Sequence, residues 1–115
     1  MRNLEQDMDT GKVGGGEGRA WCEGNTAKCW VSFFPLTKGP YRIISTDYTG
    51  YTVIWTCLDL LFAHREYFWI LSRTETISEA SKTAAYAAIE AANPKYDYPT
   101  QFHFTYQGAG CNYTP

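Results

Sequence analysis

Residues 40–73 read PYRIISTDYTGYTVIWTCLDLLFAHREYFWILSR. They hold three runs, residues 41–48, 51–58 and 66–73, that are dense in the aromatic and β-branched side chains favoured in strands. Only Thr49 and Gly50 separate the first two runs, and Gly50 can adopt a positive φ, so we expect a tight antiparallel hairpin. Apolar side chains occupy both faces of these runs. The predicted sheet must therefore be covered on both sides.

Two shorter strands are expected before this stretch, over residues 19–23 and 27–34, around a turn that contains Gly24-Asn25-Thr26. In that hairpin Cys22 falls opposite Cys29, at a separation that a cross-strand disulfide can span. Two buried free thiols agree with the pattern equally well. Both states stay open at this point.

A helix is expected after the third run. Thr76-Ile77-Ser78-Glu79 has the spacing of a capping box, with Thr76 as the cap, and alanine-rich residues 80–92 favour the helix that follows. Asn93-Pro94 should end it.

The apolar stripe of this helix, with Tyr86 and Ile89 flanked by alanines, is suited to pack against the outside of the sheet. Residues 101–106 then alternate enough to predict a final strand.

The N-terminal segment is polar and then rich in glycine. It predicts a flexible lead-in over residues 1–15, followed by one domain over residues 16–115. A phosphate-binding loop would need a buried strand before the glycines and a helix after them, and the sequence offers neither.

Composition excludes several classes of protein. The chain has 115 residues and a net charge of −2 without basic clusters, which argues against nucleic-acid binding. No apolar run approaches the roughly 20 residues of a membrane span. The first seven residues are polar and acidic, unlike a secretory signal peptide. His64 and His103, the only histidines, lack other ligands at metal spacing, so no metal site is expected.

Thr46-Asp47-Tyr48, Tyr51, Trp55-Thr56-Cys57 and residues 68–73 together resemble the second and third motifs of the lipocalins, within the apolipoprotein D, bilin-binding and crustacyanin group. The resemblance covers roughly residues 15–111. It implies a mainly β fold: an antiparallel up-and-down barrel with one C-terminal helix packed outside. The first lipocalin motif, Gly-x-Trp, is missing, and only five or six strands can be counted. We therefore expect a partial barrel without the first two or three strands.

The resemblance also implies which side chains point into the barrel, because side chains alternate between the two faces of a strand. Trp21, Trp30, Phe34 and Cys57 would point outward. Ala20, Cys22 and Cys29 would point inward. The expected ligand contacts also point inward, and they are Val31, Phe33, Tyr41, Ile43, Thr52, Ile54, Thr56, Tyr67, Trp69 and Leu71.

In the family, the cysteines matching Cys57 and Cys111 bridge to cysteines in the part of the barrel that is missing here. Three states of Cys57 and Cys111 therefore stay open: free thiols, a disulfide with each other, or disulfides between molecules. The arginine matching Arg73 lies across the first-motif tryptophan in a cation–π contact, which leaves Arg73 without its family partner.

The leading functional hypothesis is a non-enzymatic, secreted carrier of a small hydrophobic ligand, such as a bilin, carotenoid, retinoid, steroid or fatty acid, with no required cofactor. The alternative is a truncated lipocalin whose open sheet recruits another protein or forms a homodimer, or which has no function. A third hypothesis is an isomerase that uses Cys22 or Cys29 as its nucleophile. Asn112-Tyr113-Thr114 fits a glycosylation acceptor.

Overall fold

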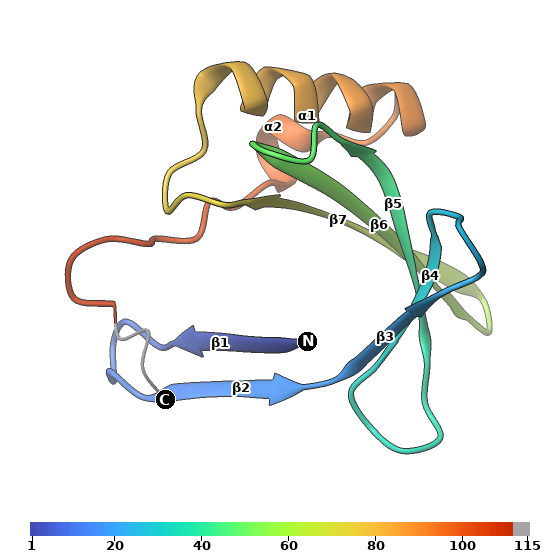
Figure 1. Ribbon diagram of the computed structural model, residues 1–115, viewed down its shortest axis with the longest axis horizontal. Coiled ribbons are helices and arrows are strands. Elements are labelled where there is room, and N and C mark those ends of the chain that lie inside the picture. The colour runs from blue at the N-terminus through green and yellow to red at the C-terminus, as the bar shows by residue number, and fades with distance from the viewer. Residues whose placement is uncertain (112–115) are drawn as a thin grey trace.

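The computed structural model describes residues 1–111, and the Asn112 acceptor lies outside them. Its main sheet has five antiparallel strands in the order in which they follow along the chain (Figure 1). The expected up-and-down β architecture is confirmed, as an open sheet and not a closed barrel. The strands of this main sheet are β3 (Arg19–Cys22), β4 (Lys28–Ser32), β5 (Gly39–Thr46), β6 (Tyr51–Leu60) and β7 (Ala63–Ser72).

One face of β5, β6 and β7 is covered by α1 (Glu79–Ala92), which lies above the curled sheet in Figure 1. Ala85 and Ile89 of the helix are fully buried against Val53 and Phe68. Alanine has no bulk beyond Cβ, so the helix can approach the strands closely. The prediction that the helix packs outside the sheet is confirmed. We call this face of the sheet the outer face and the opposite one the inner face.

The register of β5 against β6 shifts within the strand. Ile43 pairs with Ile54, but Ser45 already pairs with Val53, so Ile44 has no partner of its own. A β-bulge of this kind re-aims one side chain. Ile44 therefore packs against the core under the helix, while Ile43 stays opposite Ile54.

The helix begins later than the predicted capping box. Ser78 is the N-cap, and its side chain accepts a hydrogen bond from the Ser81 N–H at 3.1 Å. Thr76 lies outside the helix and accepts a hydrogen bond through its carbonyl from Thr74. Glu79 is the first helical residue and therefore cannot reach back as the third residue of a box. The predicted end at Asn93 is confirmed, since the Asn93 N–H closes the last turn on the Ile89 carbonyl.

The N-terminal segment was expected to be flexible, but it forms an antiparallel hairpin of β1 (Arg2–Gln6) and β2 (Val13–Glu17). The Asp7 carboxylate holds its turn by accepting the N–H groups of Asp9 and Thr10. A Cβ on Gly15 would collide with the backbone of β1. The glycines therefore permit the two strands to approach closely. Composition alone suggested instead that they make this segment flexible.

The predicted strand over residues 101–106 is wrong. The chain forms the short helix α2 (Tyr98–Gln101), with a proline in its first turn, and no strand follows within the described residues. The rings of Tyr98 and Phe102 both pack on Tyr86 of α1, with centroids 4.7 and 6.0 Å away. Contacts spaced four residues apart belong to a helical turn, and here they outweigh the local alternation.

Candidate ligand-binding site

The inner face of β6 and β7 carries paired side chains that run along both strands. Ile54 lies opposite Trp69, Thr56 opposite Tyr67, and Thr52 opposite Leu71. Opposed residues on neighbouring antiparallel strands share one face and contact each other. The rings of Tyr67 and Trp69 stack with centroids 5.8 Å apart. The result is a continuous, largely apolar surface.

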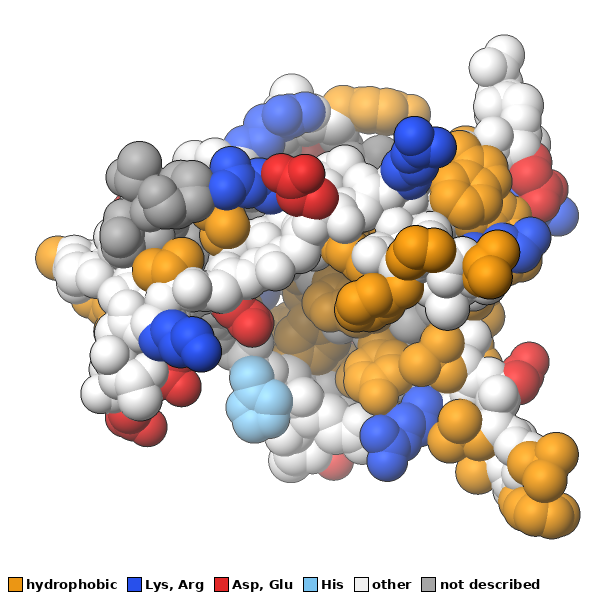
Figure 2. All heavy atoms as spheres, turned by 90° about the horizontal axis from the view of Figure 1, so that it is seen from below, with side chains coloured by type: hydrophobic (Ala, Val, Ile, Leu, Met, Phe, Trp, Pro, Cys, Tyr) orange, Lys and Arg blue, Asp and Glu red, His pale blue; other side chains and the backbone are white. Residues whose placement is uncertain are grey.

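Exposure changes from one strand to the next on this face. Ile54 on β6 is only 2% exposed, whereas Tyr67, Trp69 and Leu71 on β7 are 37%, 45% and 49% exposed. Seen from the side of the β1–β2 hairpin, the molecule is hollowed in its middle, and hydrophobic side chains lie deep in this opening (Figure 2). The inner face is therefore apolar and accessible at once.

The hydroxyl groups on this face are partly used by the protein itself. Thr56 donates to the Pro40 carbonyl at 2.6 Å, and the Thr52 hydroxyl lies 2.9 Å from that of Thr46. Tyr41 lies opposite Cys29 on the neighbouring strand. Burial raises the pKa of the Tyr41 phenol above its ordinary value, so Tyr41 stays neutral and can donate or accept a hydrogen bond.

The pairing register of β4 to β7 places nine of the ten expected ligand-contact residues on the inner face. Ile43 joins through its pairing with Ile54, and Val31 lies on the same side of β4 as Cys29. Phe33 is the exception, because it follows the end of β4 and its ring lies beside Gly18. That these nine residues contact a ligand stays a prediction.

Comparison with known proteins decides the family. Residues 3–105 match the family model described as a lipocalin-like domain. The chain belongs to the lipocalin family. Rat apolipoprotein D (Rattus norvegicus) is 43% identical to this lipocalin over 49 residues, which cover 41% of this chain and 26% of the relative. Mouse apolipoprotein D (Mus musculus) is 41% identical over the same shares of the two chains.

Solved structures agree on the fold. Lobster apocrustacyanin A1 superimposes on this lipocalin with a TM-score of 0.80 at 24% sequence identity, covering 97% of this chain and 61% of its own. H1 crustacyanin from the lobster Homarus americanus gives the same values. This lipocalin thus spans less than two thirds of the relatives it matches, both in sequence and in structure.

The cysteines of the first hairpin form a disulfide, Cys22–Cys29. Of the two states left open by the sequence, the structure shows the bonded one. Neither sulfur is a free thiol in this state, so the isomerase hypothesis has no nucleophile at these positions. Cys57 and Cys111 are both free. Burial, with the nearby charges of Asp59 and Glu66, raises the pKa of the Cys57 thiol.

Arg73 finds a partner that the sequence did not suggest. Its guanidinium donates from Nε and Nη2 to the Tyr48 carbonyl, at 3.3 and 3.2 Å. Tyr48, and not Gly50 as expected, takes the positive φ in this turn, at 67°. Gly50 is needed for another reason, since a Cβ there would lie 2.6 Å from the Ser81 hydroxyl of α1.

One pocket of this lipocalin lies away from most of the predicted ligand contacts. It has a volume of about 890 Å³ and is formed by residues 17–19, Trp21 and residues 32–38. Of the ten expected contacts only Phe33 lines it. Two features of the sequence could have indicated this pocket. Arg19 and Trp21 lie on one face of β3, and the apolar loop Phe33-Phe34-Pro35-Leu36 follows later in the chain.

Two features are absent from the described residues. No cluster of three or more histidine, cysteine, aspartate or glutamate side chains is arranged to hold a metal ion within residues 1–111. In the same residues, no helix has the length and apolar character needed to cross a membrane.

Proposed function

We propose that this lipocalin binds a small hydrophobic ligand on the inner face of β5, β6 and β7. One observation carries the proposal: Tyr67, Trp69 and Leu71 are all more than a third exposed, although they lie on an ordered sheet whose other face is covered by α1. A continuous exposed apolar patch is typical of a binding site. Each 100 Å² of apolar surface removed from water contributes about 2.5 kcal/mol.

The chemistry of the face favours an extended or ring-shaped apolar molecule with few polar groups. The stacked rings of Tyr67 and Trp69 offer a flat surface, and Tyr41 offers a neutral hydroxyl. Bilins, carotenoids, retinoids, steroids and fatty acids all have this character. The protein would act as a carrier and not as an enzyme, as the lipocalin family suggests, and would need no cofactor.

Secretion is part of the proposal. Disulfides persist in oxidising compartments and are rare in the cytosol, and the Cys22–Cys29 bond favours an extracellular site of action. Membership of the lipocalin family, with apolipoprotein D among the relatives, supports the same view.

Fluorescence titration tests the inner face. Retinol, biliverdin and progesterone are added separately to the purified protein while tryptophan emission is recorded. We expect saturable quenching by at least one of them at micromolar concentration. Trp69→Ala should weaken that binding by tenfold or more, since it removes the largest exposed side chain of the face. Phe62→Ala is the matched control, because Phe62 is an exposed aromatic residue at the β6–β7 turn, away from both faces.

Two results would contradict the proposal. One is quenching that rises linearly with every ligand, which indicates collisions without a site. The other is equal weakening by Trp69→Ala and Phe62→Ala, which would mean that the inner face has no special part in binding.

A second function is favoured by the edges of the sheet. β3 and β7 each have a neighbour on one side only within the described residues, and unpaired strand edges can recruit another chain. This homodimer or partner surface is tested by sedimentation over a range of protein concentrations. A protein that stays monomeric at all concentrations would contradict the homodimer hypothesis.

A further inference from the structure

The pocket formed by residues 17–19, Trp21 and residues 32–38 lies between β3 and the loop that follows β4. In Figure 1 this loop lies next to β3. The pocket volume of about 890 Å³ is within the range of small-molecule sites in proteins. We call it the loop pocket. Its walls come from Trp21 on β3, Ser32 at the end of β4, and the loop.

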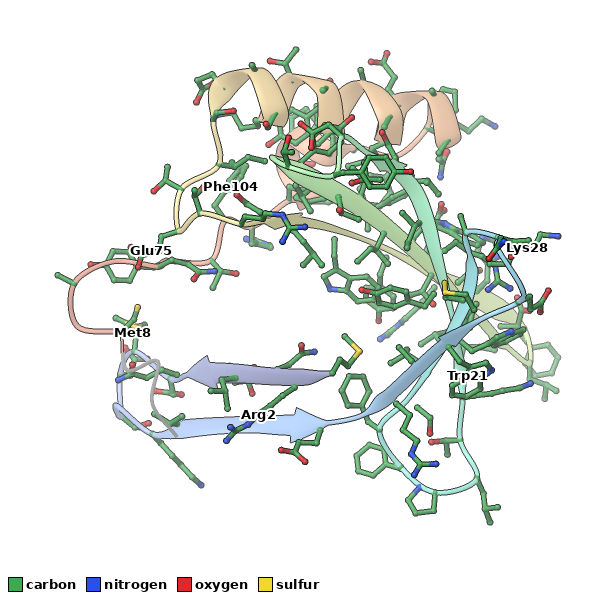
Figure 3. The ribbon with its side chains drawn as sticks, in the orientation of Figure 1. Arg2, Met8, Trp21, Lys28, Glu75 and Phe104 are labelled. Atoms are coloured by element: carbon green, nitrogen blue, oxygen red, sulfur yellow. A yellow bond between two sulfur atoms is a disulfide. The ribbon has the colours of Figure 1, made fainter. Side chains whose placement is uncertain are left out.

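The loop pocket is separate from the inner face. Trp21 pairs with Trp30, and the Trp30 ring lies under the Arg42 guanidinium, 4.8 Å from its centroid. Arg42 pairs with Trp55, which packs against the core under α1. Paired residues share a face, so Trp21 belongs to the outer side. In Figure 3 Trp21 lies away from the space between the main sheet and the β1–β2 hairpin.

Two cations and one anion line the loop pocket. The Arg19 guanidinium makes no hydrogen bond or ion pair within residues 1–111, so its N–H donors are available. Lys38 lies over the Trp30 ring, 4.4 Å from the centroid. The single acid, Glu17, is already 3.7 Å from Arg2. The pocket therefore has an excess of positive charge.

The rest of the lining is aromatic and aliphatic. Trp21 is 44% exposed, and the side chains of Phe34 and Leu36 are still more exposed. Leu36 also adopts a positive φ of 65°, a conformation that costs a non-glycine residue about 1–2 kcal/mol. A strained backbone that presents an apolar side chain to water suggests that this loop closes over a ligand.

We propose that the loop pocket is a second binding site, which takes a small aromatic anion: a flat apolar ring system that carries a sulfonate or carboxylate. The ring system stacks on Trp21 beneath the loop. The anionic group accepts hydrogen bonds from the guanidinium of Arg19, whose fork geometry suits planar and tetrahedral oxyanions. Lys38 adds positive charge at the rim. This site goes beyond the inner-face function and does not depend on it.

Titration calorimetry tests whether the loop pocket recognises the negative charge of its ligand. Naphthalenesulfonate is the charged ligand, and naphthalenesulfonamide is the uncharged comparison. We expect the sulfonate to bind the wild-type protein about tenfold more tightly than the sulfonamide, because it adds a charge-assisted hydrogen bond. Arg19→Gln should remove this difference and leave sulfonamide binding unchanged. Arg65→Gln, an exposed arginine at the start of β7, is the matched control and should keep the difference.

Nuclear magnetic resonance locates the site. The sulfonate should shift the indole N–H of Trp21 and the amide of Gly18, and leave the indole N–H of Trp69 in place. A shift of Trp69 alone, or a sulfonate preference that survives Arg19→Gln, would overturn the proposal. So would binding of vesicles of anionic phospholipid with no binding of the sulfonate, since the partner would then be a lipid surface.

The proposals for the inner face and for the loop pocket can be rejected independently of each other. Retinol titration of Arg19→Gln should match that of the wild-type protein, because Arg19 is not on the inner face. Loss of retinol binding in Trp69→Ala, together with no sulfonate binding in any variant, would retain the inner-face function and reject the loop pocket.

Discussion

A single carboxylate organises the turn between β5 and β6. Oδ1 of Asp47 accepts the N–H groups of Thr49, Gly50 and Tyr51 at 3.0, 2.7 and 3.0 Å. These hydrogen bonds lower the pKa of Asp47, and the bond from Tyr51 has the largest effect. They lower it because they favour the charged form of the carboxylate. The stability that they contribute is therefore fully present above the ordinary pKa of aspartate, near 3.9. It is lost as the pH falls through the lower pKa of the folded state.

Asp47→Asn should expose this linkage. Near neutral pH we expect the variant to unfold at lower urea concentration than the wild-type protein, and the gap between the two midpoints should narrow as the pH falls below about 3.9. Thr49→Ala is the control in the same turn. It removes no titratable group, so its effect should not change with pH. A gap for Asp47→Asn that is constant across the acidic range would contradict this account of the turn.

Individual positions differ in how far the sequence could predict them. Alternation along a strand is a property of the backbone, so fixing Trp69 on the inner face also fixed Tyr67 and Leu71 there. The partners of long polar side chains are set by tertiary contacts. Arg73 donates to the Tyr48 carbonyl. Glu66 accepts hydrogen bonds from Trp55 and Asn93. No local sequence pattern connects the residues in these contacts.

The helix and the sheet are held together by a small core. Ile89 is fully buried among Val53, Phe68 and Ala85. Ile89→Ala should lower the free energy of unfolding by about 2–5 kcal/mol, since it removes buried methyl groups and leaves a cavity. Glu90→Ala, at the neighbouring exposed position, should change it by about 0.5 kcal/mol or less. Urea denaturation measures both, and equal effects would mean that α1 does not pack on the sheet as described.

Elements stabilised by their own sequence were predicted well, and elements stabilised by distant contacts were not. The five strands of the main sheet and α1 were found within a few residues of their observed bounds, because β-branched runs and alanine runs have strong local preferences. The segment after Pro94 depends on the packing of Tyr98 and Phe102 on Tyr86. The β1–β2 hairpin depends on close approach at Gly15. Neither cause can be read from a short window.

At the scale of the whole molecule, the two faces of the main sheet differ in how they are covered. α1 buries the outer face of β5–β7, whereas the β1–β2 hairpin lies on the side of the inner face (Figure 1) and leaves Tyr67, Trp69 and Leu71 exposed. No residue of the hairpin belongs to the core under the helix. The asymmetry explains why one face is a structural core and the other is available to a ligand. The family resemblance implied this asymmetry, but composition did not.

The hairpin should contribute little to global stability. It is connected to the main sheet through Gly18, whose N–H and carbonyl both bond to Met1, and the pair Arg2–Glu17 is exposed, where such pairs contribute little. Removal of residues 1–15 should therefore lower the free energy of unfolding by about 1 kcal/mol or less, well below the effect of Ile89→Ala. Urea denaturation followed by tryptophan fluorescence measures the change. A shortened chain that no longer unfolds cooperatively would show that the hairpin is part of the folding unit, and that the predicted boundary between residues 15 and 16 does not separate a lead-in from the domain.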